Sequence, residues 1–325
     1  MNALVQVGYG SPLDVLELRD VEIPRVGERD VLVRVRAASV NALDWHTTRG
    51  MPYFLRAFLG LRTPRHAVRG IDLAGRVEAV GAKVTELAPG DEVFGGSDGS
   101  FAEYTATPPD RLARKPAGLA FEQAATLHVA ALTALQGLRD AARLRAGQSV
   151  LVHGAGGGVG TFAVQIAKWL GARVTAVTRT ESVELVRSLG ADEVIDHRRE
   201  DFADSGRGYD VFFDVGGARP LADCRRVLAE RGTLVVVGAP PGRWLAPVTR
   251  LLHAAALSPF VRQRVVPFVS KNDAAGLATL SRLAETGEVR PVLDRTYPLE
   301  RAAEAIRYVG EGHARGKVVV EIDRS

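Results

Sequence analysis

A strand, a glycine-rich turn and a helix follow one another in the middle of the chain, and this run constrains the fold more than any other feature. The apolar triplet from Val150 to Val152 indicates a buried parallel strand, and large apolar side chains recur at helical spacing through residues 161–170. Glycines let an anion approach the backbone N–H groups of the turn, at the positive end of the helix dipole. A tight turn without a ligand is the alternative, but this context favours the pyrophosphate of a dinucleotide. The predicted cofactor-binding residues of the turn are Gly154, Gly156, Gly157, Gly158, Val159 and Gly160.

The residues after the next strand bear on which dinucleotide binds. The strand predicted at residues 173–177 is followed by Thr178, Arg179 and Thr180. In dinucleotide-binding folds this end usually carries an acid on the ribose 2′-hydroxyl. Here a guanidinium and two hydroxyls stand where a 2′-phosphate needs donors, which favours NADPH over NADH. Alternatively, Arg179 is a solvated loop residue and Glu181 takes the role of the acid.

Length and composition predict a two-domain protein of the ordinary globular kind. The chain has 325 residues, more than a single core usually supports, and 46% of them are hydrophobic. Its apolar runs are all shorter than the roughly 20 residues of a membrane span, and its N-terminus does not resemble a secretion signal. We therefore expect a cytoplasmic protein without a membrane partner. The single cysteine, Cys224, excludes an internal disulfide framework and leaves too few thiolates for a structural zinc site.

The charge distribution argues against a nucleic-acid partner. The formal net charge is only +4, and the arginines are scattered along the chain. The nearest basic cluster, Arg198 and Arg199, is flanked by Glu200 and Asp201, as expected of a solvated loop.

Hydrophobic patterning divides the chain into a β-rich first part and an alternating second part. In the first 120 residues, strands are expected at 3–7, 31–35, 75–80 and 91–94, separated by turns with proline or glycine. A helix is then expected at 124–142, followed by strands at 150–152, 173–177, 193–195, 211–215 and 233–237 and by helices at 182–189 and 221–229. Such alternation predicts a doubly wound parallel sheet, that is, a Rossmann fold of the α/β class. After Gly238 the pattern is irregular and rich in proline, before helices at 273–286 and 299–309 and a last strand at 317–322.

Several motifs, in order along almost the whole chain, resemble the medium-chain dehydrogenase/reductase superfamily. The similarity is to its zinc-independent, quinone oxidoreductase-like branch, which includes NADPH:quinone reductases and zeta-crystallin. It is carried by the glycine turn and by the segments 39–45, 70–77, 89–94, 99–104, 124–134 and 316–320. The resemblance implies a β-rich GroES-like catalytic domain at 1–120, completed by 266–325, and a Rossmann NADP(H)-binding domain at 121–265.

The resemblance also implies chemistry without a metal. Zinc-dependent relatives carry a cysteine near the position of Asn41 and a His-Glu pair where this chain has Ile71 and Asp72. Because Ile71 cannot ligate a metal, no catalytic zinc is expected, and alcohol oxidation, which needs a Lewis acid, is disfavoured. The expected reaction is hydride transfer from NADPH to a quinone or to an activated double bond in an α,β-unsaturated carbonyl compound. An NADPH-binding redox sensor or structural protein with little turnover is the alternative, and metal-free carbonyl or alcohol chemistry is a third possibility.

Three residues are candidates for the catalytic role. The resemblance places Asn41 at the nicotinamide end of the cleft, where its amide could donate to a substrate oxygen; alternatively it satisfies the backbone of a turn. Tyr53 could donate a proton beside Trp45 and Phe54 in an apolar pocket, or all three could pack in the core. Asp44 is expected to cap or orient, and Asp72 to be structural.

The third catalytic candidate, His128, stands where this branch commonly has proline. It could relay a proton in the cleft, although a solvent-facing histidine at the start of a helix is the simpler interpretation and is favoured.

Further cofactor contacts are implied by the resemblance. Thr133 matches a position near the nicotinamide ribose, and Gly238 should pass close to the same ribose. Ser182 and His197 stand where some quinone reductases place a lysine and a tyrosine on the adenosine phosphate, and Arg179 could supply the lysine's charge. Residues 268–272 resemble the segment that returns across the cleft. A homodimer is expected through the edge of the Rossmann sheet, within residues 238–268, and pocket shape should depend on residues 47–64 and 240–267.

Overall fold

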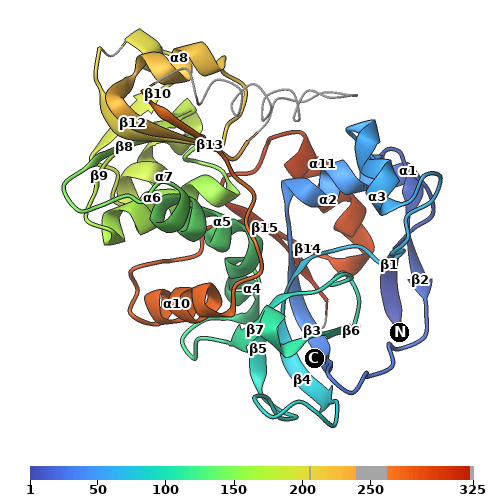
Figure 1. Cartoon of the computed structure of the whole chain (residues 1–325). Helices are drawn as coiled ribbons and strands as arrows, with labels where there is room; N and C mark the ends of the chain where they lie inside the picture. Colours follow the sequence, from blue (N-terminus) through green and yellow to red (C-terminus); the bar gives the residue numbers. More distant parts are fainter. Residues whose placement is uncertain (205, 239–261, 323–325) are drawn as a thin grey trace. The chain divides into compact units, whose positions relative to one another are not determined.

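The computed structural model describes residues 1–204, 206–238 and 262–322, which fall into two compact units (Figure 1). The first unit comprises residues 1–130, 272–287 and 291–325, and the second comprises residues 131–271 and 288–290. The first unit thus ends at Ala130 rather than at residue 120. The side chain of His128 and the backbone N–H of Val129 are both hydrogen-bonded to Asp72, in a strand of that unit. The second unit extends to Lys271 rather than to 265, because Ser270 and Lys271 are hydrogen-bonded within it.

The second unit contains a six-stranded parallel sheet in the order β10-β9-β8-β11-β12-β13. Its strands are β8 (Ser149–His153), β9 (Arg173–Thr178), β10 (Glu193–Asp196), β11 (Tyr209–Asp214), β12 (Leu228–Val236) and β13 (Arg264–Pro267). This is the doubly wound order of a Rossmann fold, with the reversal between β8 and β11. The predicted fold class is confirmed. The strand β13 was not predicted, because its proline and polar neighbours hide a short edge strand that pairs in parallel with β12.

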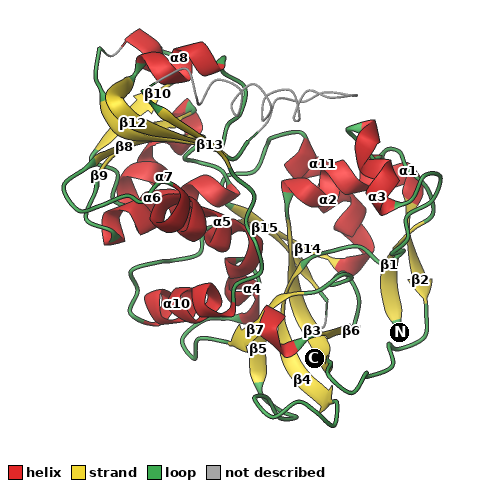
Figure 2. Cartoon of the chain, viewed as in Figure 1, coloured by secondary structure: helices red, strands yellow, loops and turns green. Residues whose placement is uncertain are grey.

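Helices cover both faces of this sheet, as its continuous apolar strands require. Figure 2 shows α6 (Gly158–Trp169) and α7 (Val183–Ser188) on one face and α8 (Leu221–Arg226) on the other. Phe162 and Ile166 of α6 are fully buried, whereas Cys224 of α8 joins Leu151 and Phe212 in the core on the opposite face. The helix α8 is shorter than predicted, because Leu228 already belongs to β12. Two 3-10 turns, η5 (Thr180–Ser182) and η6 (Phe202–Asp204), complete the connections.

The single helix predicted at 124–142 is wrong in detail. The chain forms α4 (Phe121–Ala124), a π-helical turn η3 (Leu127–Ala131), α5 (Leu132–Leu135) and a second π-helical turn η4 (Gln136–Ala141). At η3 the N–H of Val129 donates to the carboxylate of Asp72, 3.0 Å away. A side chain that bonds to the helix backbone in this way is a recognised cause of helix irregularity, and π turns are frequent at functional sites.

The first unit contains a seven-stranded sheet in the order β14-β15-β3-β4-β5-β7, with β6 also paired to β3. Its strands are β3 (Val31–Val40), β4 (Asp72–Val80), β5 (Glu92–Gly96), β6 (Tyr104–Thr107), β7 (Leu112–Arg114), β14 (Leu293–Pro298) and β15 (Lys317–Glu321). A separate pair is formed by β1 (Asn2–Gln6) and β2 (Leu16–Asp20). The last strand, β15, runs antiparallel to β3, so the end of the chain completes the β-rich unit.

Short helices accompany these sheets. They are α1 (Pro12–Val15), α2 (Ala42–Arg49), η1 (Tyr53–Leu55), α3 (Arg56–Leu59), η2 (Pro109–Arg111), α10 (Ala274–Glu285), η8 (Leu299–Arg301) and α11 (Ala302–Gly310). Ile306 of α11 packs in one core with Val318 and Val320 of β15. Within the described ranges, the helices all fall short of the length and apolar character needed to cross a membrane. Most of the segment predicted to mediate dimerisation and to shape the pocket, residues 239–261, lies outside the described residues.

Candidate active site

The glycine turn of the second unit lies at the carboxyl end of β8, beside the strand-order reversal where doubly wound sheets bind ligands. Gly154 has a φ of +84°, a conformation that other residues rarely adopt. A Cβ on Gly160 would lie 2.1 Å from the carbonyl oxygen of Gly154, and one on Gly156 would lie 2.6 Å from the hydroxyl of Thr178. These positions therefore require glycine. The turn leads directly into α6, whose first residues are Gly158 and Val159 and whose free N–H groups can donate to an anion.

An unpaired hydroxyl beside the turn fits a cofactor. The side chain of Ser182 is fully buried, and its Oγ has no hydrogen-bond partner among the described residues. A Cβ on Gly156 would lie 2.8 Å from that oxygen, so the hydroxyl borders the space that the glycine leaves open. A buried hydroxyl normally finds a partner, so the residues present fit a bound group that supplies one.

The end of β9 presents the residues predicted to select the 2′-phosphate. Thr178 is buried, and Arg179, which follows it, is half-buried. Glu181, the alternative acid, lies in η5 and forms an ion pair with Arg198 at 2.5 Å. The other predicted adenosine contact, His197, donates its backbone N–H to the carbonyl oxygen of Thr178 and so lies beside this strand end.

One carboxylate at this edge was missed. Asp196, the last residue of β10, accepts a hydrogen bond from the hydroxyl of Thr180 at 2.6 Å and another from the N–H of Arg198 at 3.1 Å. Both bonds lower the pKa of the Asp196 carboxyl group, and the bond from Thr180 has the larger effect. Only the pairing of β10 with β9 brings Asp196 to this position, so no local sequence signal indicates it.

The remaining predicted cofactor residues of the second unit are held by short contacts. The hydroxyl of Thr133 donates to the hydroxyl of Ser270 at 3.0 Å, which fixes the segment predicted to return across the cleft. Gly238 donates its N–H to the carbonyl oxygen of Asp214. A Cβ on Gly238 would lie 2.0 Å from the carbonyl oxygen of Val215, so only glycine fits there.

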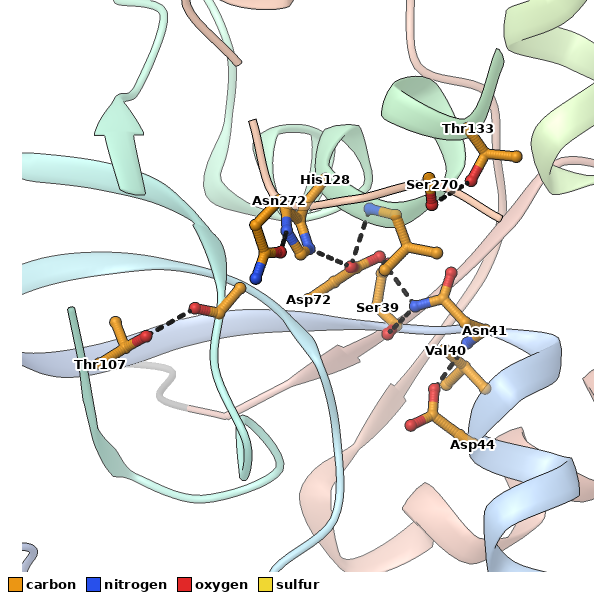
Figure 3. Close-up of polar contacts among 12 residues, drawn as sticks. Ser39, Val40, Asn41, Asp44, Asp72, Thr107, His128, Thr133, Ser270 and Asn272 are labelled. Atoms are coloured by element: carbon orange, nitrogen blue, oxygen red, sulfur yellow. Dashed lines mark hydrogen bonds and ion pairs between the residues drawn. The ribbon is translucent and has the colours of Figure 1, made fainter. Parts of the chain in front are cut away.

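In the first unit, a buried polar network surrounds Asp72, at the start of β4 (Figure 3). Its Oδ1 accepts from His128 Nδ1 at 3.0 Å and from Val129 N at 3.0 Å, and its Oδ2 accepts from Ser39 Oγ at 2.7 Å, Asn41 Nδ2 at 2.9 Å and Lys317 Nζ at 3.4 Å. Burial by itself would raise the pKa of Asp72, but Lys317, His128 and Asn41 together lower it to about 2. Asp72 is therefore an anion in a fully buried position.

Lys317, the first residue of β15, supplies the matching cation and was not singled out from the sequence. It is only 2% exposed. Its Nζ donates to the carbonyl oxygen of Val40 at 3.2 Å, to Asn41 Oδ1 at 2.7 Å and to Asp72 Oδ2. Burial lowers its pKa, and the charges of Asp72 and Asp44 oppose that shift. Three acceptors around the nitrogen match the three N–H groups of an ammonium ion.

His128 lies inside this network, so the favoured prediction of a solvent-facing histidine is wrong. Its exposed fraction is 4%, and its Nε2 lies 3.3 Å from Oδ1 of Asn272, an exposed residue. Space for the ring comes from Gly96, where a Cβ would lie 2.2 Å from the ring. The hydroxyl of Thr107 in turn donates to the carbonyl oxygen of Gly96 at 2.9 Å (Figure 3). The π turn η3 and the packing of β5 bury His128, and neither was predicted.

Asn41 and Asp44 join the network to the start of α2. The N–H of Asn41 donates to Asp44 Oδ2 at 2.8 Å, so Asp44 caps the helix, as predicted from the sequence. Burial raises the pKa of Asp44 to about 7, and the nearby charge of Asp72 adds to that shift. The amide of Asn41 bonds to both Asp72 and Lys317, so its role here is to connect the carboxylate with the ammonium.

The aromatic candidates lie outside this set of contacts. Tyr53 is half-buried in η1, with the guanidinium of Arg56 4.8 Å from the centre of its ring. Trp45 packs against the core of α11 and closely approaches Gly310, as the core-packing alternative expects. Phe54 is half-buried.

The described residues offer no ready metal site. Throughout those ranges, no group of three His, Cys, Asp or Glu side chains is placed to hold a metal ion. Both oxygens of Asp72 are already bonded, and Cys224 is buried in the core of the second unit. The absence of zinc stays a prediction.

The fold and these sites have counterparts in known proteins. Residues 27–117 match the family model described as alcohol dehydrogenase GroES-like domain, and residues 189–320 match the one described as zinc-binding dehydrogenase. A chloroplastic NADPH-dependent alkenal/one oxidoreductase of Arabidopsis thaliana is 36% identical over 335 residues, which cover 98% of this chain and 79% of the relative. The chain belongs to the medium-chain dehydrogenase/reductase superfamily, as its motifs predict.

Other relatives connect it with the quinone oxidoreductases of that superfamily. The quinone oxidoreductase of Mus musculus is 33% identical over 339 residues, which cover 98% of this chain and 97% of the relative. The solved structure of the quinone oxidoreductase from Coxiella burnetii superposes with a TM-score of 0.88 at 29% identity, and 99% of each chain is covered. The predicted resemblance to quinone oxidoreductases is confirmed.

Proposed function

We propose that the protein is an oxidoreductase that uses NADPH to reduce a quinone or the activated double bond of an α,β-unsaturated carbonyl compound, without zinc. The observation that carries this proposal is the turn after β8, where required glycines meet the start of α6 and the buried hydroxyl of Ser182, which has no partner among the described residues. The relatives named as an NADPH-dependent alkenal/one oxidoreductase and as quinone oxidoreductases support the same cofactor and substrate classes.

The second unit would hold the cofactor. The N–H groups of the glycine turn and of the first turn of α6 suit the pyrophosphate, and Arg179 with Thr178 suits the 2′-phosphate. Ser182 and His197 border the same strand end, and Thr133 and Gly238 are proposed for the nicotinamide ribose. When bound, NADPH supplies the hydride.

The first unit would contribute the polar groups that act on the substrate. A conjugated substrate needs positioning and a proton or hydrogen bond for its oxygen more than it needs a Lewis acid. Asn41, Tyr53 and His128 are the proposed residues. The neighbouring Ile71 and the saturated oxygens of Asp72 support zinc-free chemistry.

The test is oxidation of NADPH and of NADH, followed by absorbance, with a panel of quinones and enones and metal-free protein in a chelator. We expect turnover that prefers NADPH and persists without metal. Tight NADPH binding without turnover would instead identify a redox sensor or structural protein. Loss of activity on chelation, restored by zinc, would refute the zinc-free proposal.

Residence in the cytoplasm and a homodimer are further proposals, made from the sequence and the family resemblance. Light scattering tests the dimer, and a monomer over the working concentration range would refute it.

A further inference from the structure

The network around Asp72 leads from a buried cation to an exposed side chain. Lys317 contacts Asp72, Asp72 contacts His128, and His128 contacts Asn272. The first three are nearly or fully buried, and Asn272 is exposed. We propose that Lys317 and Asp72 are positioning residues that hold the imidazole of His128 as the proton donor of the reaction, with Nε2 directed toward Asn272. The inference rests on the proposed function for the reaction that consumes the proton.

The contacts of the ring indicate which of its nitrogens carry protons. Nδ1 faces a carboxylate oxygen of Asp72 that also accepts from the N–H of Val129, so Nδ1 must donate. Nε2 faces the amide oxygen of Asn272, which is also an acceptor. A ring between two acceptors is satisfied when both nitrogens carry protons, and its positive charge is balanced by the anion of Asp72.

The charges around His128 come from three elements. Asp72 on β4 is the carboxylate in contact, Lys317 on β15 lies behind it, and Asp44 on α2 adds a carboxyl group on the far side of Asn41. From β5 and from the segment before α10, the ring is faced by the uncharged residues Gly96 and Asn272. The positive charge of Lys317 offsets the negative charge of Asp72, so the ring of His128 lies beside an anion that has a cation behind it.

The position of the ring is set by shape as well as by charge. Gly96 leaves the space that the imidazole fills, since a Cβ there would overlap the ring at 2.2 Å. A methyl group at this position would therefore displace the ring without changing any charge.

Proton transfer from His128 completes the reduction of an enone. The hydride adds to the β-carbon of an enone, and the electron pair of the double bond moves to the α-carbon and the carbonyl oxygen. The α-carbon of this enolate takes the proton of Nε2, which forms the C–H bond of the saturated product. The neutral imidazole then takes a proton from water on the side of Asn272. A quinone that has accepted the hydride likewise takes a single proton from Nε2, which gives the hydroquinone.

The first test needs no turnover. In protein with ¹⁵N-labelled histidine, the ring signals of His128 should show a protonated Nδ1 and a protonated Nε2, because each nitrogen faces an acceptor. The signals are assigned by their loss in His128→Asn. In Asp72→Asn the doubly protonated form should be less populated than in the wild type at the same pH, because the balancing anion is gone. A wild-type ring with one protonated nitrogen throughout would overturn the proposal.

The second test compares how the pH dependence of kcat changes when the negative charge of Asp72 or the positive charge of Lys317 is removed. In Asp72→Asn, the decline of kcat at high pH should move to lower pH by about one unit, because the imidazolium loses its anion. In Lys317→Met it should move to higher pH by a similar amount, because a competing cation is gone. Should Lys317→Met fail to fold, Gly96→Ala serves instead: it should lower kcat with little change in KM.

The control is Lys115→Met, another nearly buried lysine of the same unit, whose Nζ lies 3.1 Å from Glu92 Oε2. It should leave the pH profile in place. General damage to the fold would not move the two profiles in opposite directions.

The third test follows the proton that His128 delivers to the α-carbon of the substrate, through the stereochemistry of the product. With an enone that carries a substituent on its α-carbon, the wild type should give one enantiomer, and His128→Asn should give a mixture with lower kcat. Unchanged stereochemistry and pH profile in His128→Asn would overturn the proposal while leaving the proposed function intact. A doubly protonated ring in a protein without turnover would refute the proposed function and the donor role, but not the positioning.

Discussion

The glycine turn and the network around Asp72 solve opposite physical problems. The turn is built from seven consecutive residues, 154–160, and works by leaving side chains out, so that backbone N–H groups stay open to an anion. The network joins residues of β3, β4, η3 and β15, far apart in sequence, and works by satisfying charges that would otherwise be costly to bury. Substitutions in the turn should therefore affect ligand binding, and substitutions in the network should affect stability first.

The largest expected effect is on the network. Lys317→Met removes the buried ammonium that contacts the anion of Asp72, so we expect a loss of about 3–5 kcal/mol in the free energy of unfolding. Urea denaturation measures it. The matched variant Lys115→Met should cost much less, because the partner Glu92 is 37% exposed and can be hydrated. Equal losses in the two variants would contradict the distinction between buried and exposed partners.

The next effect is on the turn. Gly160→Ala places a Cβ 2.1 Å from the carbonyl oxygen of Gly154, so the turn must shift. We expect NADPH to bind about a hundredfold more weakly, which corresponds to about 2.8 kcal/mol, with a smaller change in unfolding. Cofactor fluorescence titration measures the affinity. Gly208→Ala, in the same unit, meets its nearest atom only at 3.4 Å and should bind normally.

A change of charge at the end of β9 sharpens the cofactor assignment. Arg179→Glu should weaken NADPH binding by about 1.5–3 kcal/mol and NADH binding far less, because only NADPH carries the 2′-phosphate. Isothermal titration with both dinucleotides checks this. Arg187→Glu, an exposed position on α7, is the control for a general change of charge. Equal weakening of both dinucleotides would refute the role of Arg179.

The last expected effect is on how the free energy of unfolding depends on pH. Because burial raises the pKa of Asp44 to about 7, the folded state holds this proton more tightly than the unfolded state does. Its contribution to stability is therefore complete at acid pH and is lost as the pH rises through about 7. Asp44→Asn, which mimics the neutral form, should be more stable than the wild type above about pH 7 and similar to it below about pH 4.

Urea denaturation of both proteins over a series of pH values measures this difference. If the wild type and Asp44→Asn show the same dependence of unfolding on pH around neutrality, Asp44 is not the group responsible.

Much of the fold could be predicted from local patterns. The continuous apolar strands and the intervening helices of the second unit indicate a parallel sheet because each element is buried in a characteristic way. The predictions failed where long-range contacts set the local structure. The strand β13 depends on its pairing with β12, and the π turn at His128 coincides with a bond from Val129 to Asp72.

The candidate sites divide in the same way. The steric demands on Gly154, Gly156 and Gly160 arise within the turn or from the adjacent strand, so residue types and spacing alone indicate an anion site and, with Arg179, the class of cofactor. The role of Lys317 and the burial of His128 could not be predicted, because a lysine in a strand and a histidine near a helix start are ordinary surface residues in sequence. Only the packing of β15 against β3 and of η3 against β4 buries these two side chains around Asp72. Burial turns ordinary ionisable groups into a coupled set, and burial is a property of the tertiary structure.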